Sequence, residues 1–344
     1  MIRSLQILRA GPGLTIQDLG RPGWHAYGVS NGGAVDRMAL YEGAALLGQT
    51  ANCAALEMPT YGGDFLIEGD CRIALTGAPM VAQLDGVKLV WNASHKVTNG
   101  QRLSIGAATT GVYGYLSVSG GFQTPEWMGS RSAHLAANIG GLLSTGDRLP
   151  VGDDPNEGGM SVFLPERDRF SGGDIRVVTT LHTSLFSNAE VERFTQTNFQ
   201  RSLRSNRQGA ALTFDGLPFT PDAGQTILSE PMIMGDIQMT GDGYPFVLQS
   251  ECQTAGGFAR IAQVLPCDLS TVAQATPDRV LRFRFVTFEE ADLAYQSYLT
   301  DLKNLRGQTR PLLRRVEDIR DLLSYQLISG AVTGWETDMP EDCK

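Results

Sequence analysis

The chain has 344 residues and carries 28 basic against 37 acidic residues, which gives a formal net charge of −9. Affinity for nucleic acid is built on neutralising phosphates, so this balance argues against a nucleic-acid partner. The length is generous for a single domain and favours two.

Targeting and redox features are sparse. The first 14 residues contain Arg3 and Arg9 and lack the uninterrupted apolar core of a signal peptide, and no later stretch is apolar for long enough to span a bilayer. Five cysteines form an odd set with no Cys-x-x-Cys pair, and the four histidines are scattered. We therefore expect a cytoplasmic protein with no membrane contact, reduced thiols and no metal site.

The first half of the chain is predicted to be mostly β. Its short apolar runs are punctuated by Gly, Asn or Asp at intervals typical of barrels and sandwiches, and they cover 72–75, 87–91, 102–105 and 113–118. One helix is predicted over 37–47, where apolar residues recur at helical spacing and Asp36 is placed to cap the first turn.

A second β series follows a polar, glycine-rich stretch at 152–173. Its runs cover 174–180, 211–214, 246–249, 261–264 and 280–286. Thr287 and Glu290 form a capping-box pattern that opens a helix over about 288–306, and a further helix is predicted over about 312–325. The chain is thus divided into an N-terminal unit at 1–160, a second β unit at 174–290 and a helical tail at 291–344.

Two glycine-rich polar stretches lie about 230 residues apart, GLTIQDLGRPG at 13–23 and QTAGGF at 253–258. Each sets polar side chains beside glycines, which let the backbone bend or approach a ligand closely. Two such stretches predict one site that is built from both halves of the chain.

Together with further short motifs, these stretches resemble the biotin-dependent carboxyltransferase family. That family includes the carboxyltransferase region of urea amidolyase, the allophanate hydrolase subunit 2 proteins, the KipA-like proteins and the C subunit of bacterial 5-oxoprolinase. The resemblance runs in family order from about residue 11 to 290 through GVSNGGAVD (28–36), ALE (55–57), LTGA (75–78), SGG (119–121), GSRS (129–132), GDIQ (235–238) and GDGYP (241–245). It implies a mainly β fold of two cyclophilin-like β-barrel units, with the functional site at their junction; composition alone equally allows sandwiches.

Four charged residues inside these motifs are the catalytic candidates. Arg21 and Arg131 suit an anion because a guanidinium binds a carboxylate through two nitrogens, although an ordinary ion pair is as good an interpretation of each. Asp18 and Glu57 are carboxylates that could accept a proton or orient an amide. Asp18 could equally fix a turn, whereas Glu57 is flanked by Leu56 and Met58 and would be costly to bury without a partner.

Polar side chains that suit an amide or ureido group are the substrate-binding candidates. Gln17, Gln238 and Gln253 each offer donors and an acceptor, and Thr254 adds a hydroxyl.

The glycines beside them could act through the backbone. Gly256 and Gly257 could present N–H groups to an oxyanion, or could simply form a tight turn between strands. The family reads Thr-Thr-Gly-Gly-Tyr here, so Ala255 and Phe258 remove two polar groups.

Three functions follow from the resemblance. The first is a component of an ATP-dependent complex that opens 5-oxo-L-proline to L-glutamate, with a partner that resembles KipI or the B subunit of 5-oxoprolinase, and with a LamB/YcsF-like protein. The second is carboxyl transfer to urea or a related amide from carboxybiotin that a partner supplies. The third is a KipA-like regulator that binds a kinase inhibitor. The chain has neither a GxxxxGK[ST] loop nor a biotin-bearing Met-Lys-Met segment, so ATP or biotin would need a family-specific pocket or a partner.

Overall fold

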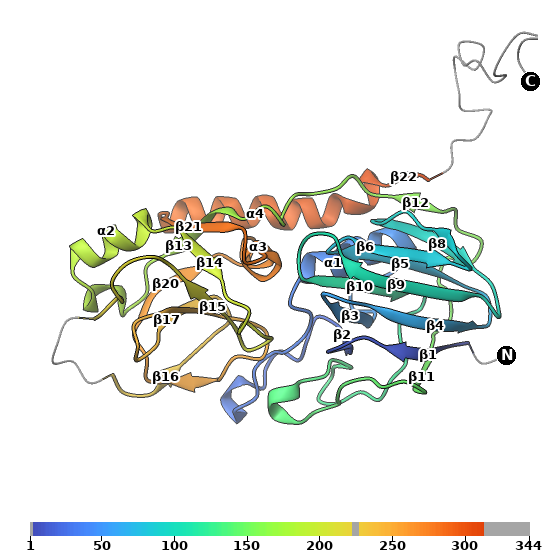
Figure 1. Cartoon of the computed structure of the whole chain (residues 1–344), viewed down its shortest axis with the longest axis horizontal. Coiled ribbons are helices and arrows are strands. Elements are labelled where there is room, and N and C mark those ends of the chain that lie inside the picture. Colours follow the sequence, from blue (N-terminus) through green and yellow to red (C-terminus); the bar gives the residue numbers. More distant parts are fainter. Residues whose placement is uncertain (1–2, 222–226, 313–344) are drawn as a thin grey trace, which may run out of the picture.

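The structure is a computed structural model that describes residues 3–221 and 227–312. Two β-rich units lie beside each other, and a long helix runs across both of them (Figure 1). The mainly β fold with few helices, predicted from the sequence, is confirmed. Among the described residues, no helix has the length and apolarity that crossing a bilayer requires.

The first unit consists of two sheets. One has the strand order β11-β1-β4-β9-β6-β7 and the other β2-β3-β10-β5-β8-β12-β22. The first sheet comprises β1 (Ser4–Ala10), β4 (Gly63–Glu68), β6 (Met80–Leu84), β7 (Val87–Lys88), β9 (Arg102–Ala108) and β11 (Arg148–Pro150). The second comprises β2 (Thr15–Gln17), β3 (Ala55–Pro59), β5 (Cys71–Gly77), β8 (Ala93–Val97), β10 (Tyr113–Val118), β12 (Val162–Phe163) and β22 (Arg310–Pro311).

One apolar core joins these two sheets. Ile7 and Phe65 from the first sheet and Leu75 and Leu116 from the second belong to the same buried cluster. Such burial from both sides is the main force that holds two sheets face to face.

Helix α1 (Arg37–Leu47) covers the other face of the second sheet. It begins and ends where the sequence predicts, and the Asp36 side chain accepts a hydrogen bond from the Ala39 amide at 3.4 Å. Gly43 allows the close approach, because a Cβ there would lie 2.4 Å from the Ser117 hydroxyl of β10. Strand β10 is therefore buried on both faces.

The second unit is a closed barrel with the strand order β13-β20-β17-β18-β15-β14-β21. Strands β13 and β21 pair in parallel and close it, while the other neighbours are antiparallel. Its strands are β13 (Gly173–Val178), β14 (Phe199–Arg201), β15 (Gly209–Thr213), β17 (Asp236–Met239), β18 (Pro245–Leu248), β20 (Arg260–Val264) and β21 (Val280–Phe285). Helices α2 (Asn188–Gln196) and α3 (Leu269–Gln274) and the ribbon of β16 (Glu230–Pro231) with β19 (Ala255–Gly256) complete the unit.

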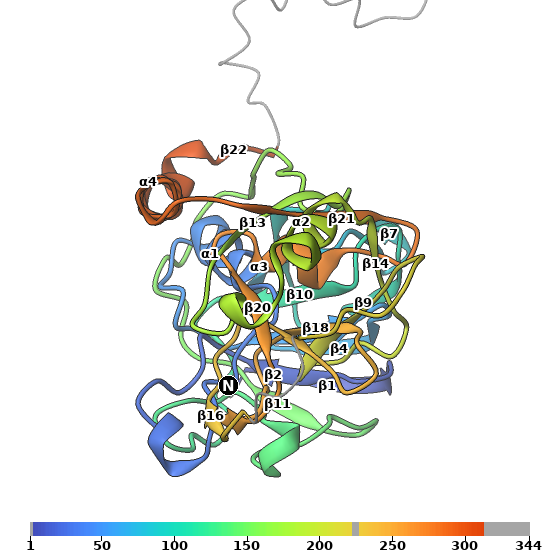
Figure 2. The same cartoon turned by 90° about the vertical axis from the view of Figure 1, so that its left-hand side faces the viewer.

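Helix α4 (Phe288–Asn304) leads from the barrel back to the first unit. The predicted capping box of Thr287 and Glu290 is present, and a 3-10 turn (Leu305–Gln308) extends the helix. Strand β22 then pairs with β12. Viewed from the barrel end, α4 lies at the edge of the molecule (Figure 2). All but the first residue of the predicted helix over 312–325 lies outside the described residues.

Candidate functional site at the junction of the two units

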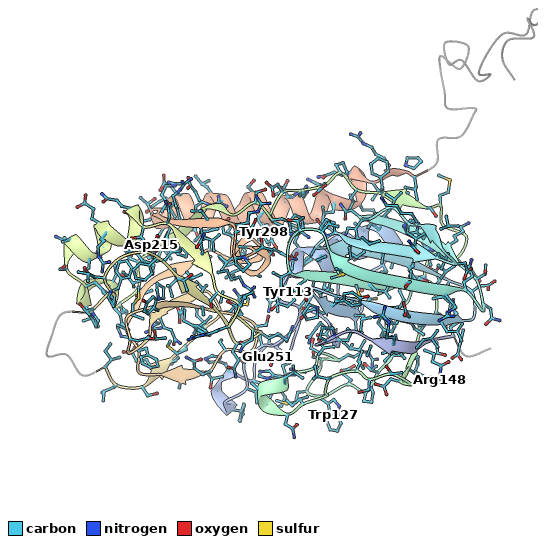
Figure 3. The ribbon with its side chains drawn as sticks, in the orientation of Figure 1. Tyr113, Trp127, Arg148, Asp215, Glu251 and Tyr298 are labelled. Carbon is cyan, nitrogen blue, oxygen red and sulfur yellow. The ribbon has the colours of Figure 1, made fainter. Side chains whose placement is uncertain are left out.

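A cavity of about 560 Å³ opens where the two units meet. Tyr113 of the first unit and Glu251 of the second lie at this junction (Figure 3). Its volume falls within the range of small-molecule sites. The first unit contributes Gly13, Pro59, Thr60, Gly111, Val112, Tyr113, Leu135 and Ala136; the second contributes Arg201, Leu203, Ser205, Asn206, Arg207, Gln208, Glu251, Thr276 and Pro277.

Arg207 joins the two units through a buried ion network. Its Nη1 donates to Glu57 of β3, its Nε donates to Glu251 at 2.5 Å, and its Nη2 donates to the Gly33 carbonyl at 2.7 Å. Burial by itself would lower the pKa of the Arg207 guanidinium, but the charges of the two carboxylates outweigh it and raise that pKa. The guanidinium is thus a permanent charge, fixed on three sides.

Glu57 accepts three hydrogen bonds at the junction. Besides Arg207, it accepts the Tyr115 hydroxyl at 2.6 Å and the Val35 amide at 3.0 Å. Tyr115 stands directly opposite Glu57 in the β3–β10 register, where cross-strand side chains meet. Burial, reinforced by the charge of Glu57, raises the pKa of Tyr115 well above its usual value. Glu57 therefore orients the junction, with three of its roughly four acceptor positions engaged by these donors.

His134 lies on the first-unit side of Glu251. Its Nδ1 accepts the Ala137 amide at 3.1 Å and lies 3.9 Å from Glu251, while its Nε2 is 2.8 Å from the Ser30 hydroxyl. Since Nδ1 is an acceptor, the ring proton belongs on Nε2. Burial lowers the pKa of His134, although the charge of Glu251 opposes the shift.

Arg201 is the cation in the cavity wall that lacks a carboxylate partner among the described residues. Only 7% of its surface is exposed, and its Nε has no hydrogen-bond partner in the described part of the chain. Burial lowers the pKa of its guanidinium, while the neighbouring Tyr113 hydroxyl opposes that shift. The arrangement offers a positive charge, inside an otherwise largely apolar cavity, to an incoming anion.

The predicted residues Asp18, Arg21 and Arg131 meet in one cluster of loops. Asp18 accepts the Ser130 hydroxyl at 2.6 Å and the Arg131 amide at 2.7 Å. The Arg21 side chain is wholly buried, donates to the Ser132 carbonyl, and leaves Nε and Nη1 without partners among the described residues. Burial lowers the pKa of Arg21.

That cluster does not line the cavity. Asp18, Arg21 and Arg131 are absent from its described lining, and the Arg131 guanidinium donates to the Thr124 carbonyl and, at 3.0 Å, to Gln123. Gln17 is buried in β2 and donates to the Ala133 carbonyl at 3.2 Å. These side chains connect the loops of the first unit to one another.

The substrate-binding candidates of the second half gather in the barrel unit. Gln253 donates to Gln238 at 2.8 Å, and the Thr254 carbonyl accepts the Met232 amide at 3.0 Å. Gly256 belongs to β19, where it pairs with Glu230, and Gly257 follows directly. The described residues that line the junction cavity include none of these five candidates, Gln238, Gln253, Thr254, Gly256 and Gly257.

The two glycine-rich stretches still meet, through backbone next to them. The Gly32 amide donates to the Ser250 carbonyl at 2.9 Å, which brings the loop after Arg21 against the loop before Gln253. Glu251 lies between Ser250 and Gln253, so its position just before the QTAGGF stretch could have identified it as a site residue from the sequence. The sequence around Arg201 and Arg207 carries no comparable signal, and sequence reasoning missed both.

Comparisons with known proteins agree on one family. The family model "Carboxyltransferase domain, subdomain A and B" matches residues 27–285. The C subunit of 5-oxoprolinase from Escherichia coli (strain K12) is 35% identical over 298 residues, which cover 85% of this chain and 94% of that protein.

Two fungal proteins extend the likeness. The urea amidolyase of Saccharomyces cerevisiae is 26% identical over 94% of this chain but only 19% of its own length. The crystal structure of the Kluyveromyces lactis urea carboxylase has a TM-score of 0.77 at 26% identity, over 92% of this chain and 30% of that one. The chain therefore belongs to the carboxyltransferase domain family, with subdomains A and B together.

Proposed function

We propose that this chain acts like the C subunit of 5-oxoprolinase, as one component of a cytoplasmic, ATP-dependent complex that opens 5-oxo-L-proline to L-glutamate. The observation that carries the proposal is the extent of the match. The chain aligns with 94% of a relative that bears that name, whereas it aligns with 19% of a urea amidolyase.

The junction cavity suits the substrate. 5-Oxo-L-proline is a small lactam ring with one carboxylate, and the guanidinium of Arg201, whose Nε has no partner among the described residues, would bind that carboxylate. Val112 and Pro277 offer apolar surface to the ring methylenes. Asn206 also lines the cavity and uses its Oδ1 to accept the Gln208 amide at 2.8 Å, so its amide nitrogen would be the group that donates to a lactam oxygen.

The chemistry needs a second reactant beside the lactam. Transfer of the γ-phosphoryl group of ATP to the lactam oxygen, with release of ADP, would make the ring carbon electrophilic. Water then adds to that carbon, and the C–N bond breaks as the nitrogen takes a proton, which leaves an acyl phosphate. A second water hydrolyses the acyl phosphate to the carboxylate of glutamate and free phosphate. Because the chain has no GxxxxGK[ST] loop, ATP would bind with the help of partners. We expect these to be a protein that resembles KipI or the B subunit of 5-oxoprolinase, and a LamB/YcsF-like protein.

Carboxyl transfer to urea or a related amide is the alternative, favoured by the likeness to urea carboxylase over 92% of this chain. Carboxybiotin would supply the carboxyl group from a partner. Arg201 and Asn206 would then hold its ureido and carboxylate oxygens against the apolar wall.

The test measures 5-oxoproline-dependent ATP hydrolysis and glutamate release by the chain alone and mixed with the proteins encoded beside it. We expect glutamate only in the mixture. An assembled complex that releases no glutamate but consumes carboxybiotin with an amide would establish the alternative. A complex without any turnover that captures a kinase inhibitor would establish the regulatory function.

A further inference from the structure

A second cavity lies beneath α4, where α4 meets α1 and α3. Its volume is about 110 Å³, which is room for about three or four non-hydrogen atoms. It shares no lining residue with the junction cavity. Its walls are formed by Val35, Arg37, Tyr41, Met234, Pro266, Leu269, Ser270, Tyr295, Tyr298, Leu299 and Leu302.

Arg37 is the charged residue among those that line this cavity, and no acidic residue of the described lining balances its positive charge. Its Nε and Nη2 are buried and have no hydrogen-bond partner among the described residues, and the described lining contains no acid. The neighbouring Asp36 is already engaged by Arg169 at 2.7 Å and by Gln274 at 2.8 Å. A buried charge without a partner is costly, so a ligand that supplies negative charge is favoured here.

The two unpartnered nitrogens form the edge of the guanidinium that binds carboxylates elsewhere in this chain. Three other arginines use Nε and Nη2 together to bind both oxygens of one carboxylate. These pairs are Arg72–Asp154 at 2.7 and 2.7 Å, Arg176–Asp268 at 2.9 and 2.6 Å, and Arg193–Glu190 at 3.1 and 2.7 Å.

The remaining walls narrow the ligand class. Tyr41, Tyr298 and Ser270, each of which carries a hydroxyl, line the cavity together with Leu299 and Leu302. Hydroxyls can donate to oxyanion oxygens, whereas the leucines and the small volume leave no space for a phosphate ester or a nucleotide.

We propose that the cavity beneath α4 binds a small anion that presents two oxygens to Nε and Nη2 of Arg37, either a simple carboxylate or bicarbonate. The anion touches α1, α3 and α4 at once, so its binding stabilises the contact of α4 with both units. This site is independent of the function proposed for the junction cavity.

The test follows the thermal unfolding midpoint of the full chain during titration with sodium formate and, separately, sodium bicarbonate, each against sodium chloride at equal ionic strength. Formate, bicarbonate or both raise the midpoint of the native chain beyond the effect of chloride, and the more effective anion identifies the ligand. Arg37→Lys keeps the charge but loses the two-nitrogen edge, and weakens this response by roughly tenfold or more. Arg193→Met is the matched control, because that edge is already occupied by Glu190, and its response equals that of the native chain.

Two results overturn the proposal. One is a native chain that responds to neither anion beyond chloride; the other is an equal response in Arg37→Lys and the native chain. If Arg37→Lys does not fold, broadening of the ¹³C signal of labelled formate by the native chain decides instead. Broadening by the native chain that Ser270→Ala reduces supports the site. A formate signal that the native chain does not broaden, or that Ser270→Ala broadens to the same extent, refutes it.

Discussion

Removal of the Arg207 guanidinium is the sharpest test of how the two units are held together. Arg207→Met leaves Glu57 and Glu251, exposed by 0% and 2%, without the cation that both contact. Breaking a buried ion pair by deleting one partner costs about 3–5 kcal/mol, and the Gly33 carbonyl loses its donor as well. Two carboxylates share this one cation, so we expect a loss of at least about 4 kcal/mol, a large part of a typical stability of about 5–15 kcal/mol.

Urea unfolding followed by circular dichroism measures this loss, with the midpoint of the first transition as the readout because two units need not unfold in one step. Arg282→Met is the control: its pair with Asp174 is more than half exposed, and its loss should cost about 0–1 kcal/mol. The triple variant Arg207→Met, Glu57→Gln, Glu251→Gln should recover part of the stability, since no buried charge is left alone. A loss near that of the control, or a triple variant as unstable as Arg207→Met, would refute the reasoning.

Three further predictions follow from individual contacts. Arg201→Met should lower kcat/KM of the assembled complex for 5-oxo-L-proline about tenfold to a hundredfold through KM, because one charged hydrogen-bond donor is worth about 1.5–3 kcal/mol. The unfolding midpoint should not fall, since the variant removes a buried charge that has no carboxylate partner among the described residues; an unchanged KM contradicts the assignment. Because burial holds the folded pKa of His134 below its unfolded value, the unfolded chain binds more protons as the pH falls below about 6.5, and stability should drop there. Unfolding midpoints measured at several pH values should fall less steeply with decreasing pH in His134→Gln than in the native chain. An equally steep fall in both would contradict this role of His134. Thr287→Ala removes the hydroxyl that accepts the Glu290 amide at 3.1 Å and should cost about 1 kcal/mol in urea unfolding, with no loss if α4 begins elsewhere.

The elements that the sequence predicted well are those whose hydrogen bonds close within a few residues. Asp36 and the apolar spacing after it set the start of α1, and Thr287 with Glu290 sets the start of α4. Both signals depend on neighbours three positions away, so they can be recognised without knowledge of the fold.

The candidate site could be predicted only in part from such local sequence patterns. Glu57 was singled out because a carboxylate between apolar residues needs a partner, but nothing near it in the sequence identifies that partner. Arg207 is 150 residues away and belongs to the other unit. The glutamines Gln238 and Gln253 had the right chemistry for an amide, yet the fold turns them toward each other.

The sequence by itself therefore determined the family, the β character and the local helix caps, because periodicity, capping and motif order are carried by residues close together in the chain. Only the tertiary structure decided which charges meet. Strand pairing across the barrel and the packing of one unit against the other bring Arg207 to Glu57 and leave Arg201 and Arg37 without carboxylate partners among the described residues. Contacts of that kind depend on the relative positions of whole strands, a quantity that no local pattern of residues encodes.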